Sequence, residues 1–371
     1  MDKHIVVLLV VMAVGIVYSQ LRETKNNKKY CIICITLMLG LFSGLRSWWM
    51  GDLIKYYTLY TQCAGANGWA RVWVEFGNAG IRLFFWAMGS LGISYDVCIF
   101  LIAMFSAAAL GMVVFRYSPS PYWSYLMYIA MGFYLFTYSG LKQTIAMGFL
   151  MFAAIGIFET KPKKFLLWTA VAAMFHAPAL IFLAAYPVAK KRIDLKYIGI
   201  LCVVVAGMFV FRNQIVSWLM EAYYEESGQV NTSATIGGRM LMMILILVLG
   251  LFLRPAQNGD AIYRQTLNLM VVGTMLQFFS LYGNEFTRLA DYYLQFIVLF
   301  VPLMLETGGH QLKARPKYKV KQNAANVYLP LYIGITIFAL WFYSGTIEGS
   351  QLFLREYRFV WEINPYDLYG H

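Results

Sequence analysis

Residues 165–187 read FLLWTAVAAMFHAPALIFLAAYP, an apolar run with a histidine, His176, near its middle. Basic residues flank the run on both sides: Lys161, Lys163 and Lys164 before it, Lys190, Lys191 and Arg192 after it. Basic loops beside membrane helices face the cytoplasm, so a single crossing would put one flank on the wrong side. The alternative is a chain that enters the bilayer, turns near His176 and Pro178, and returns to the same side.

The composition of the whole chain is that of a membrane protein. Of its 371 residues, 60% are hydrophobic and only 13% are charged, against about 25% charged residues in soluble domains. Apolar segments of bilayer-crossing length recur throughout. The net charge of +12 therefore indicates cytoplasmic loops facing anionic membrane lipids, with no role for nucleic acid. We predict an all-α protein with one integral membrane domain, residues 1–371.

The charged loops predict a topology. With residues 165–189 as a re-entrant hairpin, the basic segments face the cytoplasm and the acidic segments face outside. A single span there would turn every later loop around and put the basic cluster Lys313–Lys321 outside.

We expect about ten transmembrane helices plus one or two re-entrant or surface helices, one of them residues 76–92, with both termini outside. Residues 46–94 and 212–237 are the expected extracytoplasmic segment and loop. The expected spans are residues 4–21, 30–45, 95–115, 122–138, 143–159, 196–211, 238–253, 266–282, 290–305 and 327–345.

A helix broken inside the membrane has a functional implication. Irregular backbone at membrane depth survives only where protein or a water-filled cavity satisfies its polar groups. The break at His176 therefore predicts a cavity open to the outer face. An alternative is a buried histidine that merely holds the turn.

Several arginines fall on the predicted outer side, where the topology rule disfavours them. Arginine presents a planar fork of donors that matches phosphate oxygens, so a group of arginines around one cavity suits a diphosphate. The alternatives are contact with lipid phosphates, or pairing with Glu75, Glu285 or Asp291. The arginines are Arg46, Arg71, Arg82, Arg239 and Arg288.

Three residues could act as a base on a sugar hydroxyl, which requires a carboxylate or an imidazole within hydrogen-bonding reach. They are Asp52, Glu75 and His176, in that order of preference. For Asp52 the alternative is a salt bridge with Arg46 in an interfacial aromatic belt. No His, Cys or Asp grouping has metal-ligand spacing, and the five cysteines do not indicate a disulfide framework. We expect no metal and no cofactor.

Several short motifs occur in order along the chain. They are Arg46 with Gly51-Asp52 and Tyr56-Tyr57, Glu75, Leu141-Lys142-Gln143 up to Ala146, Phe165 and Ala173 to Leu180 around His176, and Arg288 with Tyr292-Tyr293. Together, these motifs resemble the EpsG family, relatives of the Wzy polysaccharide polymerases of bacterial envelopes. The resemblance covers the chain from about residue 40 to its end. Two positions depart from the family pattern: Lys142 replaces the usual arginine before Gln143, and Pro178 replaces a small hydroxyl residue.

The resemblance implies a membrane-embedded, metal-independent glycosyltransferase with a GT-C-like architecture. Such an enzyme joins oligosaccharide repeat units carried on undecaprenyl diphosphate, at the outer face of the bacterial inner membrane, into O-antigen, capsule or exopolysaccharide. It also implies membrane lipids and a chain-length regulator protein as partners. We expect Arg46, Arg239 and Arg288, supported by Lys142, to bind the diphosphates, and Gln143 and Tyr292 to contact substrate.

Three other functions fit the same features. A flippase or other transporter of lipid-linked oligosaccharides would also use arginines and broken helices in a membrane cavity. A ligase of similar architecture would move the finished glycan to another acceptor. A structural or assembly subunit fits least, because ionisable groups gather on the outer face.

Overall fold

The structure is a computed structural model. Every regular element in its described part is helical, apart from one isolated antiparallel β-bridge between Arg46 and Phe359. It describes residues 3–20, 24–47, 52–64, 78–192, 194–223, 238–253, 261–281, 284–314, 337–338, 341–345 and 357–362.

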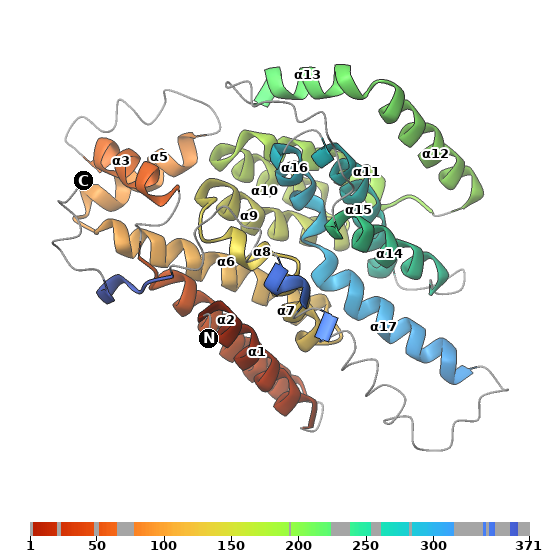
Figure 1. Ribbon diagram of the computed structural model, residues 1–371, viewed down its shortest axis with the longest axis horizontal. Helices are drawn as coiled ribbons and strands as arrows, with labels where there is room; N and C mark the ends of the chain where they lie inside the picture. The colour runs from red at the N-terminus through yellow and green to blue at the C-terminus, as the bar shows by residue number, and fades with distance from the viewer. Residues whose placement is uncertain are drawn as a thin grey trace.

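A row of packed helices forms the centre of the molecule (Figure 1). Each of α2, α6, α9 and α10 packs against the next member of the row. Next to them lies α7 (Pro121–Ala130), in which every residue is buried and which packs against α1 (Lys3–Gln20) and α17 (Ile297–Ala314). The row consists of α2 (Lys25–Gly44), α6 (Tyr95–Tyr117), α9 (Leu141–Phe158) and α10 (Pro162–Phe175).

The helix expected over residues 122–138 is broken in two. It ends after α7 and resumes as the short α8 (Phe133–Phe136). Gly132 between them has φ of 81°, a left-handed conformation that only glycine adopts readily and that commonly ends helices. This break bends the chain toward the start of α9.

The apolar run of residues 165–187 doubles back on itself. The first helix of this run is α10, which ends where His176 caps it. It is followed by the 3-10 helix η1 (Ala177–Ala184) and by α11 (Ala185–Ala189). The Phe165 ring lies 6.0 Å from Phe182 and 5.2 Å from Tyr186, centroid to centroid. An unbroken helix would hold Phe165 and Tyr186 about 30 Å apart. The reversal of the chain is thus a feature of the fold; its orientation in a membrane stays a prediction.

Two short helices lie together at one end of the molecule (Figure 1). They are α3 (Leu53–Ala64) and α5 (Ala79–Ser90), which pack on each other around a second apolar core. Each has 12 residues and is about 18 Å long, too short for a hydrocarbon layer of about 30 Å. The surface helix expected over residues 76–92 corresponds to α5.

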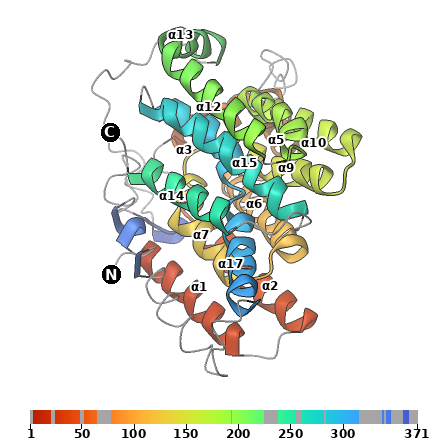
Figure 2. The same cartoon turned by 90° about the vertical axis from the view of Figure 1, so that its right-hand side faces the viewer.

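The second half of the chain is built around α15 (Ala261–Phe278), which packs against α11, α14 and α16. The helices α16 and α17 are separated by a bend of 46°, whereas the sequence predicted one helix over residues 290–305. Figure 2 shows α12 and α13 at the edge of the bundle, far from α1 and α2. The remaining bounds are α12 (Leu195–Val210), α13 (Arg212–Tyr223), α14 (Gly238–Phe252), η2 (Phe279–Leu281), α16 (Asn284–Leu294) and η4 (Val360–Glu362).

Among the described residues, two helices are long and apolar enough to cross a bilayer, α6 and α9. The bent pair α16 and α17 makes a third candidate if it counts as one broken span. Shorter apolar helices cover Lys3–Tyr18, Ala177–Ala189 and Gly238–Phe252. The all-helical prediction is confirmed, while the figure of about ten transmembrane helices stays a prediction.

Candidate functional site

The site centres on His176, where α10 ends. Pro178, in the first turn of η1, has no backbone N–H to continue the hydrogen bonds of α10, so the α-helix ends before it. His176 adopts an extended conformation, with φ of −150° and ψ of 104°. Its Nδ1 atom is hydrogen-bonded to the hydroxyl of Tyr292 on α16, a fully buried residue. The break thus turns an imidazole toward the neighbouring helix.

Two cationic side chains stand around this pair. Lys142 in the first turn of α9 and Arg288 in α16 both lie within electrostatic range of His176. Tyr292 follows Arg288 by four residues, so the two share one face of α16. The N-terminal turn of α9 adds the positive end of its dipole to the charge of Lys142. The arrangement favours an anion between α9, α10 and α16.

The two cations differ in how they are held. Lys142 Nζ donates to Asn78 Oδ1 over 2.7 Å. In the described part of the chain, the Arg288 guanidinium makes no hydrogen bond or ion pair with a protein group. Its backbone carbonyl, in contrast, accepts a 2.7 Å hydrogen bond from Gln143 Nε2. Among the described residues, Arg288 therefore has a fixed backbone and a guanidinium without a protein partner.

The short helices α3 and α5 close the site from a third direction. The phenol of Tyr56 is hydrogen-bonded to the backbone of Lys142, and both Asp52 and Arg288 act on it electrostatically. Asn78, directly before α5, is an N-cap residue whose side chain does not cap the helix; it accepts from Lys142 instead. Tyr56 and Asn78 therefore connect these helices to the cationic groups.

Asp52 lies at the edge of the site. Its side chain is 42% exposed and forms a 3.3 Å ion pair with Lys55, one turn further along. The salt bridge with Arg46 considered from the sequence is not what the structure shows. Glu75, the second base candidate, lies outside the described residues, as does Arg71. Asp52 thus brings a carboxyl group within electrostatic range of Tyr56.

Arg239 has a partner of its own. It forms an ion pair with Asp291 of α16, which is 4% exposed, and its guanidinium lies 5.3 Å from the centroid of the Phe133 ring. The predicted diphosphate role would require this pair to open. Pairing with Asp291 was the alternative that the sequence left open for these arginines. As the structure stands, Arg239 fixes α14 to α16, with Asp291 beside Tyr292.

Arg46 lies in a different cluster. It is 2% exposed and donates to the carbonyl oxygens of Ser43 and, over 3.0 Å, Thr137. Its guanidinium lies 5.2 Å from the centroid of the Tyr138 ring, and its backbone forms the β-bridge with Phe359. A diphosphate would have to displace these carbonyls, so the structure does not bring Arg46 together with Lys142 and Arg288.

The structure brings some of the predicted site residues together, and their roles stay predictions. The sequence named Lys142, Gln143, His176, Arg288 and Tyr292, which the structure brings together from three helices. Gln143 and Tyr292 make protein contacts there. Asn78 was missed, although an asparagine before an apolar helix is an N-cap signal. Tyr56 was named only as part of a motif with Asp52 and was given no role, although it follows Asp52 by one helical turn.

No group of three His, Cys, Asp or Glu side chains in the described ranges could hold a metal ion. The anion-binding character of the site comes from Lys142, Arg288 and the start of α9.

The apolar helices and the cationic site among them define a helical membrane protein. A family model, described as EpsG family, matches residues 29–357. The chain belongs to the EpsG family, which supports a role as a glycosyltransferase-like polymerase in polysaccharide biosynthesis. No curated protein and no solved structure matches the chain.

Proposed function

We propose that the protein joins oligosaccharide repeat units carried on undecaprenyl diphosphate, at the outer face of the bacterial inner membrane. The observation that carries this proposal is the Arg288 side chain. Its guanidinium donors have no partner among the described residues. Like Lys142, Arg288 lies within electrostatic range of His176. A guanidinium fork together with a lysine point charge matches the two phosphates of a lipid diphosphate.

The reaction needs only binding and proton transfer from the protein. A hydroxyl of the acceptor sugar attacks the anomeric carbon of the donor chain and forms the new glycosidic C–O bond. The bond between that carbon and the diphosphate oxygen breaks, and undecaprenyl diphosphate leaves with the electron pair. Arg288 and Lys142 stabilise the charge that develops on this leaving group, because preorganised donors act most strongly where charge appears.

A base must take the proton of the attacking hydroxyl. Asp52, Glu75 and His176 are the candidates named from the sequence. His176 already uses its Nδ1 atom in the hydrogen bond with Tyr292. Asp52 carries a carboxyl group on a side chain that is 42% exposed, and it acts electrostatically on Tyr56. We therefore propose Asp52 as the base and His176 as a hydrogen-bonding group.

The test is a polymerisation assay with purified protein in liposomes. The substrate is the lipid-diphosphate-linked repeat unit isolated from a strain in which the gene is deleted. The expected products are lengthened lipid-linked saccharides and released undecaprenyl diphosphate. Transfer of units across the bilayer without lengthening would overturn the proposal in favour of a flippase.

The same assay tests Arg288. Arg288→Ala is expected to lower kcat/KM by about 100-fold or more, in the range that removal of one oxyanion-stabilising donor costs. Arg288→Lys, which keeps the charge and loses the fork, should fall between this variant and the wild type. Arg212→Ala on the peripheral helix α13 is the matched control, because the contacts of Arg212 with described residues are with the nearby Phe209, its carbonyl and its ring. Normal chain lengths with Arg288→Ala would refute the site.

A further inference from the structure

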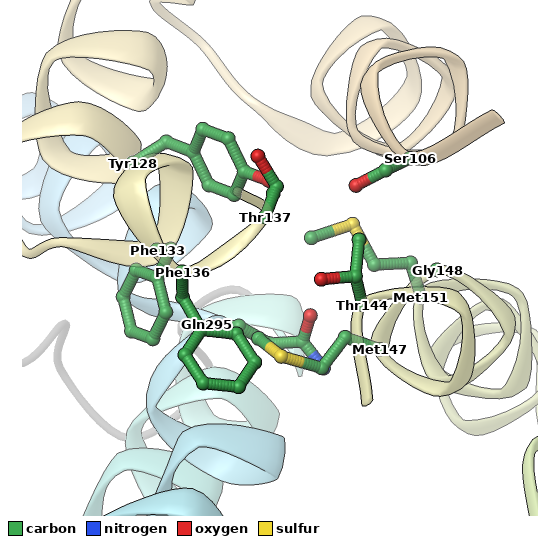
Figure 3. A pocket seen from close by; sticks show the side chains of 10 residues that line it. All are labelled: Ser106, Tyr128, Phe133, Phe136, Thr137, Thr144, Met147, Gly148, Met151 and Gln295. Carbon is green, nitrogen blue, oxygen red and sulfur yellow. The ribbon is translucent and has the colours of Figure 1, made fainter. Parts of the chain in front are cut away.

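A small cavity lies beside the site, between α6, α7, α8, α9 and the break that separates α16 from α17. Its volume is about 10 Å³, roughly the space of one water molecule. Figure 3 shows Thr144 and Gln295 directing their oxygen atoms into the same space. The lining residues are Ser106, Tyr128, Phe133, Phe136, Thr137, Thr144, Met147, Gly148, Met151 and Gln295.

Two buried polar atoms at this cavity have no hydrogen-bond partner among the described residues. They are Thr144 Oγ1 and Gln295 Oε1, on side chains that are 2% and 0% exposed. The orientation of the Gln295 amide is fixed, because its Nε2 atom donates to the carbonyl of Tyr292 over 3.1 Å. Its Oε1 must therefore receive a hydrogen bond from the cavity side. Leaving such an atom unsatisfied is destabilising, because burial removes the hydrogen bonds that it makes with water in the unfolded chain.

Thr144 differs from the other buried threonines in helices. Thr169, Thr266 and Thr274 each donate their hydroxyl to the carbonyl four residues earlier, at distances of 2.8, 2.8 and 2.9 Å. This back-bonding is the usual solution for a threonine inside a helix. Thr144 turns its hydroxyl toward the cavity instead. A side chain that gives up a local partner indicates a partner in the space it faces.

We propose that this cavity binds one ordered water molecule, which donates to Gln295 Oε1 and bonds to Thr144 Oγ1. Buried waters of this kind typically make about three hydrogen bonds to otherwise unsatisfied groups. The water joins the first turns of α9 to the break after α16, directly behind Tyr292. No carboxylate lines the cavity, and a neutral, water-sized ligand fits a few uncharged oxygens better than a cation does.

One substitution tests this proposal without any assay of activity, through the direction in which it shifts the midpoint of thermal unfolding. Thr144→Val keeps the shape of the side chain and removes its hydroxyl. With the water present, the variant loses one of its hydrogen bonds, and the midpoint of thermal unfolding in detergent should fall by about 1–3 °C. In a dry cavity the same change removes an unsatisfied hydroxyl and should raise the midpoint.

Two further variants serve as controls. Thr144→Ser keeps the hydroxyl and should stay closer to the wild type than Thr144→Val. Thr169→Val removes a back-bonding hydroxyl whose loss leaves the carbonyl of Phe165 in its helical hydrogen bond, so its effect should be smaller. A stabilised Thr144→Val, or equal losses at Thr144 and Thr169, would overturn the proposal.

A density map that resolves waters gives the direct test. A peak at hydrogen-bonding distance from both Thr144 Oγ1 and Gln295 Oε1 is expected. An empty cavity would overturn the proposal. A peak at the shorter distances typical of a metal ion would also overturn it, if the unfolding midpoint of the protein then depended on the sodium or potassium concentration.

Discussion

Arg288 and Lys142 carry the same charge but present it differently. Arg288 offers a planar fork from a helix whose backbone is fixed by Gln143. Lys142 offers a compact charge on a flexible chain, and Asn78 restricts that chain. Two phosphates joined by one bridging oxygen can use both kinds of group, one for geometry and one for charge. At the residue scale, the site therefore depends on what holds each cation.

Asn78 provides the residue-scale prediction for Lys142. Asn78→Ala removes the acceptor of Lys142 Nζ and leaves the lysine charge in place. We expect KM for the lipid-linked donor to rise several-fold, with a smaller change in kcat, because a misplaced lysine weakens binding of the whole diphosphate. Steady-state kinetics in liposomes measure both constants.

Asn78→Asp is the informative companion variant. It keeps an acceptor for Lys142 but adds a negative charge beside the diphosphate, so KM should rise more than with Asn78→Ala. Equal KM values for Asn78→Ala and the wild type would remove Asn78 from the site.

Glu159 provides a pH prediction on the side of the molecule that the sequence places in the cytoplasm. A hydrogen bond from Lys161, together with the charge of Lys164, lowers the pKa of the Glu159 carboxyl from its ordinary value. A carboxyl with a lowered pKa stabilises the folded state above its ordinary pKa, and this stabilisation is lost as the pH falls through the lowered value. Glu159→Gln should therefore cost about 1 kcal/mol or less at pH 7.

The measurement is the unfolding midpoint of wild type and Glu159→Gln between pH 3 and pH 8. The difference between them should be constant above pH 5 and disappear at the acid end. A difference that persists at pH 3 would show that the network of Glu159 with Arg116, Lys161 and Lys164 acts by another route.

At the scale of elements, the site is made where helices stop. The helix α10 ends at His176, α9 begins just before Lys142, and Asn78 precedes α5. Helix ends expose backbone groups that lack partners in their own helix, and they let side chains from different directions reach one point. The neighbouring helix α16 is held from two sides, by Arg239 through Asp291 and by the 2.6 Å bond from Tyr293 to the Ile181 carbonyl.

The turn from α9 into α10 yields the element-scale prediction. A Cβ atom at Gly156 would lie 2.7 Å from the backbone nitrogen of Phe165 and 3.0 Å from the carbonyl of Lys161. Backbone atoms at these distances cannot move aside cheaply. Gly156→Ala should therefore separate α9 from α10 and cost about 1–3 kcal/mol of stability.

Gly199 in α12 is the matched control, because nothing lies within 4 Å of a Cβ built there. Gly199→Ala should leave the unfolding midpoint unchanged or raise it slightly, since alanine favours helix over glycine. Equal behaviour of the two variants in detergent would contradict the close packing at Gly156.

At the scale of the whole molecule, the hairpin sets the orientation of everything after it. Because the chain reverses at His176, Lys163 and Lys190 are expected on the same side of the membrane, the cytoplasmic one. Cysteines introduced singly at these positions, in a variant without the five native cysteines, should resist a membrane-impermeant thiol reagent applied from outside. Lys55, with its side chain 85% exposed, is the external reference and should react.

Labelling at Lys190 but not at Lys163 would mean that residues 165–189 cross the membrane once. The predicted sides of all later loops would then be exchanged.

The sequence predicted the broken run at His176 because a charge conflict exposed it. It named Lys142 and Tyr292 through the family resemblance, and Arg288 also because arginine is disfavoured in predicted outer loops. The break at Gly132 and the bend after α16 were missed because hydropathy is continuous across both. The sequence also could not predict that Arg46 lies apart from the other cations. The position of Arg46 depends on its contact with the distant Phe359, and sequence spacing carries no information about such a contact.

The contact between Arg46 and Phe359 constrains when the fold can be completed during synthesis. The carboxylate of Glu362 pairs with Lys3 over 2.7 Å, and Tyr357 stacks on Phe42 with ring centroids 4.4 Å apart. The first two helices leave the ribosome hundreds of residues before these partners exist. Until residues 357–362 are made, the aromatic groups around Arg46 lack part of their cover. A ribosome stalled shortly before residue 357 should therefore leave this corner of the protein open to proteases that the finished chain resists.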